Sequence, residues 1–300
     1  MISDIAAGGK YPEVTFDQMT GKSLHTGKPP SSELEEIEKA LAPLMAAPQA
    51  TAIFLDLDGT LAPIVSRPEA VAVPAPISKL VRALSRIYLA VTVVSGRPAT
   101  EAKRILGISE MAYIGNHGLE TMLPGRAVVV SEEVQPYLPR IRELVDFCRS
   151  LEEALEAGVW VEDKTTTMSL HYRRAPDPRE AKRFIDDRIM PKVRQLELAP
   201  NEGRRVIEIK PPVDINKGVA VGKLLDLLEA KQAIYIGDDT TDIDALKELR
   251  KRKRRKNVVM VGVGVISDEM PADLPKYADL LVKRSSGVEM LLQLLAGEEL

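Results

Sequence analysis

The feature that most constrains the fold is a series of short apolar runs without polar alternation, separated by stretches of helical periodicity. A strand that is apolar at every residue is covered on both faces, which is typical of parallel strands between two layers of helices. The expected strands are Ala52 to Leu57, Ala90 to Val94, Tyr113 to Ile114, Ala233 to Ile236, Val258 to Val263 and Leu280 to Val282. The expected covering helices are Pro76 to Ile87, Ala99 to Leu106, Lys217 to Leu228 and Asp242 to Leu249. The sequence therefore predicts the α/β class, with a doubly wound, mostly parallel sheet.

A different pattern between residues 122 and 212 predicts an inserted α+β domain. Its strand-like runs alternate polar and apolar residues, as in an antiparallel sheet with helices on one face. These strands are Val128 to Val130, Val159 to Val161, Met168 to Arg173 and Val206 to Ile209, with helices near Pro136 to Ala157 and Pro178 to Leu196. The insertion would divide a core of residues 31–121 and 213–300. A mobile arm is expected at residues 1–30, followed by a helix from about Ser32 to Met45.

Charge and composition limit the classes of partner. The 41 Lys and Arg residues against 44 Asp and Glu residues give a formal net charge of −3, with no global attraction to nucleic acid or anionic membranes. The single cysteine, Cys148, lies in an apolar stretch and is expected in the core. No secretory signal and no apolar run of about 20 residues is evident. We expect a cytoplasmic protein that binds neither nucleic acid nor membranes; its oligomeric state stays open, and a monomer is compatible.

One segment could still bind an anion. Arg250 to Lys256 is a run of seven consecutive basic residues. Such runs bind nucleic acid in some proteins, but positive charge also suits a solvated helix end, where it complements the helix dipole. Because no aromatic residue interrupts the run to stack on bases, we favour the helix end.

Chemistry-bearing residues gather where the expected strands end. Asp56 and Asp58 follow the first strand, and Gly59 comes next. Ligands bind to open parallel sheets at the carboxyl ends of their strands, and two carboxylates there are costly without a cation.

Three further segments are expected at the same edge. Ser95, Gly96 and Arg97 follow the second strand and offer a hydroxyl and a backbone amide to a phosphoryl oxygen. Lys217 opens a helix, and a cluster of three acids, Asp238, Asp239 and Asp242, follows Ala233 to Ile236. Oxygen ligands so grouped favour a hard cation such as Mg²⁺.

In this order the four segments resemble the four motifs of the haloacid dehalogenase superfamily, from about Thr51 to the end of the chain. The resemblance implies that Asp56 is a nucleophile that becomes an aspartyl phosphate. It implies that Asp58 is the general acid and base, which would need a raised pKa, with the Asp56 charge as one cause. Ser95 and Lys217 would hold the phosphoryl oxygens. Mg²⁺ would be bound by Asp56, the backbone carbonyl of Asp58 and Asp238, with Asp239 and Asp242 as outer or water-mediated partners.

The inserted segment is similar to that of trehalose-6-phosphate phosphatases. The similar stretches include Val161 to Lys164, Ser169 to Arg173, Val206 to Pro211, Gly115 to Gly118, and Asp56 to Leu61 followed by Pro63, Pro68 and Pro74. By this resemblance Glu162, Lys164 and Glu208 would hydrogen-bond the hydroxyls of the distal glucose. The other residues expected to line the substrate site are Gly59, Thr60, Gly96, Arg97, Asn116 and His117. The resemblance implies an Mg²⁺-dependent phosphoric monoester hydrolase that acts on trehalose 6-phosphate.

Several alternatives stay open. Glu162, Lys164 and Glu208 could form a surface ion pair instead, and the substrate could be sucrose phosphate or a mannosyl- or glucosyl-glycerate or -glycerol phosphate. A rival of another class is an inactive scaffold that binds nucleic acid through Arg250 to Lys256.

The family usually has Glu and Phe where this chain has Ile243 and Leu246, and these two departures bear on how the metal ligands are supported. His171 is expected to be a satisfied strand histidine, and His117 is evenly balanced between a structural and a functional role.

Overall fold

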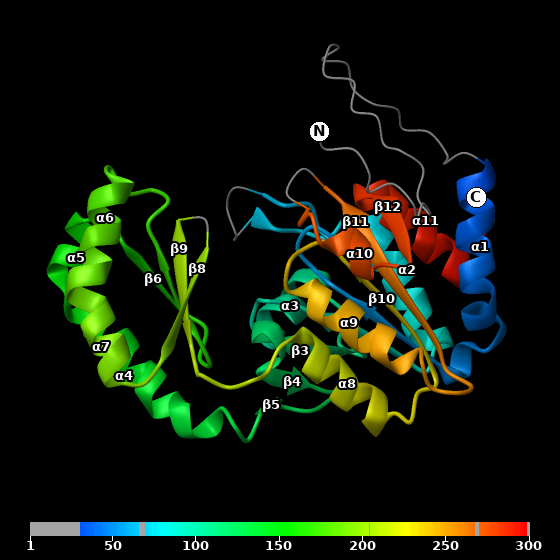
Figure 1. Ribbon diagram of the computed structural model, residues 1–300, viewed down its shortest axis with the longest axis horizontal. Coiled ribbons are helices and arrows are strands. Elements are labelled where there is room, and N and C mark those ends of the chain that lie inside the picture. The colour runs from blue at the N-terminus through cyan, green and yellow to red at the C-terminus, as the bar shows by residue number, and fades with distance from the viewer. Residues whose placement is uncertain (1–30, 66–69, 204, 268–269, 299–300) are drawn as a thin grey trace, which may run out of the picture.

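The computed structural model describes residues 31–65, 70–203, 205–267 and 270–298. The arm expected at residues 1–30, and Pro68, lie outside them. An eight-stranded sheet forms the larger part of the molecule, in the order β12-β11-β10-β1-β2-β3-β4-β5 (Figure 1). The strands from β12 to β3 are parallel, and β4 and β5 are antiparallel additions. Their bounds are β1 Thr51–Leu55, β2 Ala90–Val94, β3 Ala112–Gly115, β4 Glu120–Met122, β5 Val128–Val130, β10 Gln232–Gly237, β11 Val259–Ile266 and β12 Leu280–Lys283.

Helices cover both faces of this sheet, because successive strand residues point to opposite sides. Ile53 and Leu55 of β1 pack in one apolar cluster with helices α1, α2, α3 and α11. Ala52 and Phe54 pack in a second cluster with α8, α9 and α10. The helices are α1 Ser31–Ala46, α2 Ala75–Ile87, α3 Ala99–Leu106, α8 Lys217–Leu227, α9 Asp242–Arg252, α10 Leu274–Tyr277 and α11 Arg284–Ala296. The predicted fold class is confirmed.

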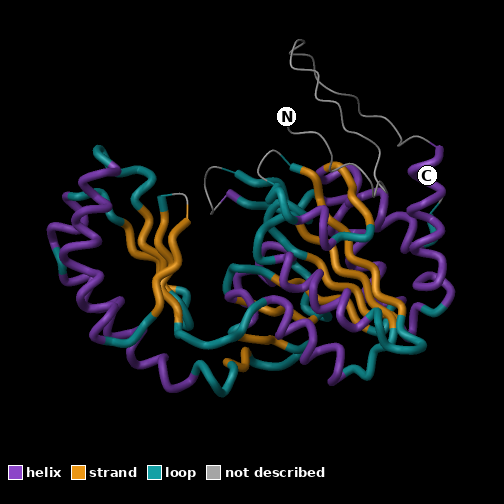
Figure 2. The backbone as a smooth tube through the Cα atoms, viewed as in Figure 1, coloured by secondary structure: helices purple, strands orange, loops and turns teal. Residues whose placement is uncertain are grey.

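A second, four-stranded antiparallel sheet in the order β6-β7-β9-β8 lies beside the first (Figure 2). Its strands are β6 Trp160–Asp163, β7 Met168–His171, β8 Ala199–Gly203 and β9 Val206–Lys210. Its helices are α4 Leu138–Ser150, α5 Glu152–Glu156, α6 Pro178–Phe184 and α7 Met190–Gln195, with a π-turn at Ile185–Ile189 between the last two. They bury an apolar cluster of their own, which includes Cys148. Residues 131–137 and 211–216 connect this unit to the larger one (Figure 2).

The structure corrects three local expectations. Val128 to Val130 was expected in the smaller sheet but forms β5, which pairs with β4 in the large sheet, because a short turn closes this hairpin locally. The strand expected to reach Leu57 ends at Leu55. The helix expected over Pro136 to Ala157 breaks at Leu151, whose backbone is extended (φ −83°, ψ 98°). β4 and β8 were not predicted, and the domain boundaries at residues 121 and 212 stay a prediction.

The basic run forms the last turn of α9 and the turn after it. Arg252 is buried; its guanidinium binds both carboxylate oxygens of Asp226 (2.6 and 2.8 Å), Glu248 (2.7 Å) and the backbone oxygen of Gly222 (2.9 Å). Lys253 pairs with Asp279 at 2.7 Å. These contacts are those of a helix end that packs on its neighbours.

In the described part of the chain, no helix combines the length and apolar character needed to cross a membrane.

Candidate active site

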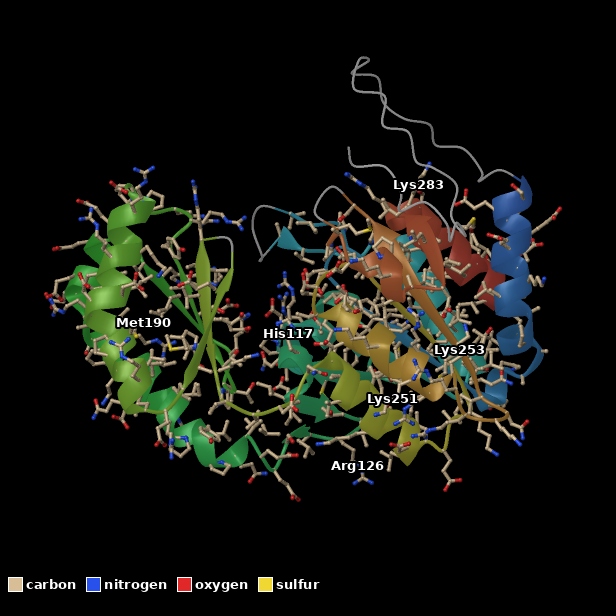
Figure 3. All side chains as sticks on the ribbon, in the orientation of Figure 1. His117, Arg126, Met190, Lys251, Lys253 and Lys283 are labelled. Carbon is tan, nitrogen blue, oxygen red and sulfur yellow. The ribbon has the colours of Figure 1, made fainter. Side chains whose placement is uncertain are left out.

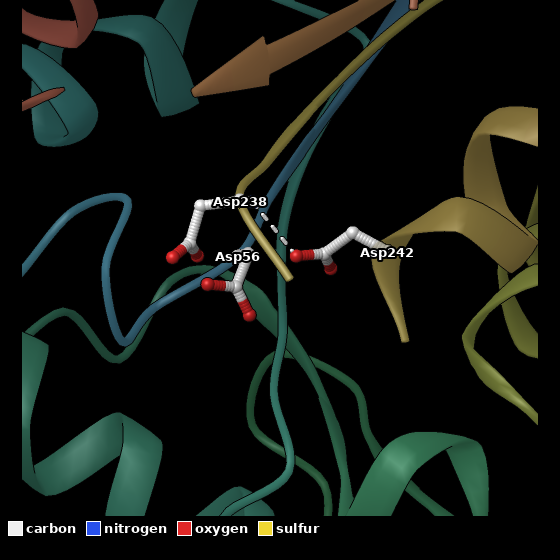
Figure 4. A group of neighbouring side chains, drawn as sticks. All are labelled: Asp56, Asp238 and Asp242. Atoms are coloured by element: carbon white, nitrogen blue, oxygen red, sulfur yellow. Dashed lines mark hydrogen bonds between the residues drawn. The ribbon is translucent and has the colours of Figure 1, made fainter. Parts of the chain in front are cut away.

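The carboxyl ends of β1 and β10 bring the acidic residues together. Asp56 follows β1, and its backbone N–H donates to the oxygen of Ile236 in β10 (2.9 Å). Asp238 follows β10, and Asp242 begins α9. Oxygens of these three buried carboxylates lie within 4.8 Å of one another (Figure 4). The parallel register of β1 and β10 therefore produces the convergence that the sequence predicted.

One lysine faces this cluster. Lys217, the first residue of α8, is 1% exposed, and its Nζ donates to Asp56 Oδ1 (2.7 Å) and Asp242 Oδ1 (2.6 Å). Its Nζ also lies 4.0 Å from Asp239 Oδ1, whose side chain is 51% exposed. The side chain of Asn216 caps the helix by accepting from the N–H of Val219 (2.9 Å), which fixes where the lysine enters.

The electrostatics of the cluster are unbalanced. Burial, with the charge of Asp242 next, raises the pKa of Asp56 well above its usual value, although Lys217 opposes the shift. Burial, together with the charges of Asp242 and Asp239, raises the pKa of Asp238 to about 7. Burial lowers the pKa of Lys217, but Asp242 and Asp56 outweigh it and raise that pKa overall. The carboxylates thus outnumber the ammonium, and a cation would relieve their repulsion.

The donor set fits a hard divalent cation. Asp56 Oδ2 is buried without a hydrogen-bond partner in the described part of the chain. Asp242, in contrast, has both oxygens engaged: Oδ1 accepts from Lys217 and from Tyr235 Oη (2.5 Å), and Oδ2 accepts from the N–H groups of Asp238 and Asp239 (both 2.9 Å). Open oxygens on Asp56 and Asp238 are suited to bind metal, whereas Asp242 is suited to orient its neighbours.

Glycine and threonine shape the turn after β1. Gly59 has φ +92°, and a Cβ at this position would come within 2.1 Å of Asp238 Oδ2. Only glycine tolerates this combination of backbone and approach. Thr60 donates from its hydroxyl to Asp238 Oδ1 (3.3 Å). Both residues therefore position Asp238.

The side chain of Asp58 is paired with an arginine. Arg97 binds it with two parallel hydrogen bonds, Nε to Oδ2 (2.7 Å) and Nη2 to Oδ1 (2.9 Å), and also pairs with Glu101 (2.5 Å). A bidentate guanidinium pair stabilises the ionised carboxylate. For Asp58 to act as the general acid that the resemblance implies, this ion pair must first open.

The turn after β2 touches the turn after β3. Ser95 is buried; its Oγ accepts from the N–H of Arg97 (3.1 Å), and its backbone oxygen accepts from the N–H of His117 (3.0 Å). A Cβ on Gly96 would come within 2.5 Å of the His117 ring. The ring of His117 thus lies directly over the Ser95–Gly96 turn, beside the position expected for a phosphoryl group.

Asn116 and His117 also contact the smaller sheet's unit, as the position of His117 in Figure 3 shows. Asn116 Nδ2 donates to the backbone oxygen of Lys164 (3.0 Å), and His117 Nε2 lies 3.8 Å from Glu208 Oε2. Burial lowers the pKa of His117 to about 4, against the opposing charge of Glu208, so the ring is neutral at pH 7. Both residues have left-handed backbone (φ 49° and 57°), which holds them at this junction.

The three residues expected to bind sugar lie together on the smaller sheet. Glu162 in β6 and Glu208 in β9 both lie opposite Ser169 of the strand between them, β7. The two carboxylates are therefore on the same face of the sheet. Lys164 lies between the carboxylates, 3.5 Å from Glu208 and 4.0 Å from Glu162. The ion pair of the alternative interpretation therefore exists, on the face that helices α4 to α7 leave open.

Tyr235, whose hydroxyl donates to Asp242, was not assigned a role from the sequence. Tyr235 is the only polar side chain among Ala233 to Ile236, and this was the available signal. His171 Nε2 lies 2.7 Å from Glu162 Oε2, which agrees with a satisfied strand histidine. Burial raises the pKa of Glu162, but His171, Lys164 and the more distant charge of Arg97 outweigh it and lower that pKa.

Comparison with known proteins agrees with this geometry. The sequence profile described as trehalose-phosphatase matches residues 54–277. The chain is 29% identical over 264 residues to probable trehalose-phosphate phosphatase G of Arabidopsis thaliana, covering 77% of this chain and 68% of that protein. It is 29% identical over 231 residues to probable trehalose-phosphate phosphatase 4 of Oryza sativa subsp. japonica, of which the match spans 59%.

Among solved structures, one described as a trehalose-6-phosphate phosphatase related protein superposes with a TM-score of 0.67 at 23% identity. The match covers 82% of this chain and 97% of that one, and it shows a shared fold. The family profile covers most of the chain and includes both carboxyl-end segments that build the acidic cluster. The chain therefore belongs to the trehalose-phosphatase family.

Proposed function

We propose that this protein hydrolyses trehalose 6-phosphate to trehalose and phosphate, with Asp56 as nucleophile and Mg²⁺ as cofactor. The observation that carries the proposal is Asp56 itself. It is buried at the end of β1, its Oδ2 has no partner among the described residues, and its Oδ1 is 2.7 Å from Lys217 Nζ. Asp56 thus lies at the strand end with one oxygen uncommitted and with a cationic donor beside the other.

In the first step an oxygen of Asp56 attacks phosphorus, and the bond between phosphorus and the sugar oxygen breaks. Lys217 and the Ser95 hydroxyl would hold phosphoryl oxygens as charge develops on them. Asp58 would give its proton to the leaving sugar oxygen, after a phosphate group has drawn Arg97 away from it. In the second step Asp58 takes a proton from water, which attacks phosphorus and releases Asp56.

The residues that would hold Mg²⁺ are Asp56, Asp238 and the backbone carbonyl of Asp58, with Asp239 and Asp242 as outer or water-mediated partners. When bound, the cation neutralises negative charge on the phosphoryl oxygens and on the acids around them. Asp242 holds Lys217 and the N–H groups of Asp238 and Asp239 in place.

We further propose that the smaller sheet and its helices, residues 138–210, form a cap that presents Glu162, Lys164 and Glu208 to the sugar. Two carboxylates accept hydrogen bonds from hydroxyls and an ammonium donates to them, which suits a neutral polyol. His117, Asn116, Gly59, Thr60, Gly96 and Arg97 would line the phosphate side. A cytoplasmic location stays a prediction from the sequence.

The test is phosphate release from trehalose 6-phosphate, sucrose 6-phosphate and glucose 6-phosphate, with Mg²⁺ or with chelator. We expect preference for the trehalose ester, loss with chelator, and a fall in kcat of about 10³-fold or more in Asp56→Asn, because the nucleophile is lost. Asp187→Asn, an exposed aspartate on the helical side of the smaller unit, is the matched control and should retain activity.

Metal-dependent release that favours another ester would keep the mechanism and change the substrate to one of the related sugar phosphates. No release from any ester would contradict the proposal. In that case salt-dependent binding through Arg250 to Lys256 becomes the function to measure.

A further inference from the structure

The smaller sheet carries an aromatic side chain on its open face. Trp160, the only tryptophan of the chain, begins β6 and is 50% exposed. It lies two residues from Glu162, so both point to the same side of the sheet. Side chains that point to the opposite face of the sheet, such as those of Leu170 and Ile207, are buried against the cap helices. Trp160 is therefore on the polar face that also carries Glu208.

The tryptophan ring is supported on one side. Its centroid lies 4.9 Å from that of His171, with the planes inclined at 35°. His171 Nε2 is in turn 2.7 Å from Glu162 Oε2. The indole is thus tied through His171 to a carboxylate already assigned to sugar binding, while half of its surface stays exposed.

The register shows how a sugar ring could meet both groups. Trp160 pairs with His171, which pairs with Val206, and Glu162 pairs with Ser169, which pairs with Glu208. These two rows lie about 7 Å apart along the strands. A pyranose ring has hydroxyls around its edge and C–H groups on its faces. A ring whose hydroxyls bind Glu162 and Glu208 therefore reaches the tryptophan of the adjacent row.

We propose that Trp160 is a substrate-binding residue whose exposed indole packs against the C–H face of the sugar ring farther from the phosphate. The inference rests on the proposed function, because it takes the occupant of this face to be the sugar of the substrate. A large rigid aromatic provides apolar contact at low entropic cost, and its N–H can donate to a hydroxyl. The carboxylates would then select the hydroxyl pattern, and Trp160 would add affinity for a second ring.

Kinetics separate this role from a purely structural one. We expect Trp160→Leu to raise KM for trehalose 6-phosphate by between about twofold and tenfold with little change in kcat, and Trp160→Phe to raise it less. Hydrolysis of glucose 6-phosphate, which lacks the second ring, should be unchanged in both variants. Leu155→Ala, which removes an exposed apolar side chain (78% exposed) from α5, is the matched control.

The single tryptophan also gives a direct signal. Asp56→Asn should bind trehalose 6-phosphate without turnover, and titration should shift the Trp160 emission in a saturable way. The same titration in Asp56→Asn with Glu162→Gln should saturate at higher concentration. Glucose 6-phosphate should shift the emission far less.

The outcomes distinguish the two proposals. If the wild type does not hydrolyse trehalose 6-phosphate, the proposed function is wrong. If it does, but Trp160→Leu leaves KM unchanged, or lowers hydrolysis of glucose 6-phosphate equally, Trp160 does not contact the sugar and only this inference is overturned. An emission that does not change at concentrations well above KM would overturn it as well.

Discussion

At the scale of single residues, the site depends on side chains that hold the reacting groups in place. Asp242 accepts four hydrogen bonds, from Lys217, Tyr235 and two backbone N–H groups. A carboxylate so engaged is rigid, and it fixes both the lysine and the turn that carries Asp238. Tyr235 is the one donor of the four that can be removed by a single-atom change.

We expect Tyr235→Phe to lower kcat by roughly tenfold with little change in KM, because a hydrogen bond to a charged group contributes about 1.5 kcal/mol or more, and Tyr235 is a buried residue of β10, whereas Glu162 and Glu208 lie on the smaller sheet. The control is Tyr113→Phe. Tyr113 is equally buried in β3, and its hydroxyl donates to the backbone oxygen of Ile108. That variant should lose stability but keep kcat. Equal losses of kcat in both would show that Tyr235 only stabilises the fold.

At the scale of elements, α8 and α9 must stay in register because α8 carries Lys217 and α9 begins with Asp242. Arg252 links the two helices through Asp226 and Gly222 of α8 and Glu248 of α9. Gly218 permits their close approach, since a Cβ there would come within 2.3 Å of the backbone oxygen of Asp244. Part of the basic run therefore supports the active site from a distance.

Arg252→Ala should lower the free energy of unfolding by roughly 2 kcal/mol, because it removes the hydrogen bonds of the buried guanidinium to Glu248 Oε1 and to the backbone oxygen of Gly222, while the contribution of the exposed Asp226 is small. Arg254→Ala, an exposed neighbour in the same run, should change it by less than about 0.5 kcal/mol. Denaturant unfolding measures both. Equal effects would mean that the run acts as a general charged patch and not through the Arg252 contacts.

At the scale of the whole molecule, two sheets with separate cores meet at the turns after β3 and β6. Asn116 and His117, in the turn after β3, contact Lys164 after β6 and Glu208 in β9 of the smaller sheet. In the proposed function both units contribute to one site, and their relative position would set which ester fits.

The acidic cluster should make global stability depend on pH and Mg²⁺ together. The pKa of Asp238 is about 7 in the folded protein without metal, above the value of 3.8 expected when unfolded. A raised carboxyl pKa stabilises the fold at low pH, and this contribution is lost as pH rises from about 4 through about 7. Mg²⁺ competes with the proton, so the rise in Tm on adding Mg²⁺ should be larger at about pH 8 than at about pH 5.

At about 100-fold excess over Kd, the Mg²⁺ stabilisation should reach about 2.7 kcal/mol at the higher pH. Asp238→Asn should abolish most of it. A shift in Tm that is the same at both pH values, or that persists in Asp238→Asn, would place the Mg²⁺ site elsewhere.

The sequence alone determined the parallel sheet, since runs such as Ala233 to Ile236 are apolar on both faces and can be buried only between helices. It also determined that Asp56, Ser95, Lys217 and Asp238 meet at one edge, because strand ends of a parallel sheet share that edge. Spacing along the chain is enough for such statements, because they depend on local periodicity.

Only the tertiary structure decided which partner each group takes. Nothing local distinguishes an Asp58 that faces a metal from one bound by Arg97, 39 residues away. Likewise β5 joined the large sheet, Tyr235 reached Asp242, and Trp160 came to lie on the open face beside Glu162. The β4–β5 hairpin and the Tyr235–Asp242 bond join residues close in sequence, but which partner each takes depends on how the chain packs around it. The positions of Asp58 and Trp160 depend on a contact between residues distant in sequence and on which face of a sheet is covered. No local pattern specifies that packing.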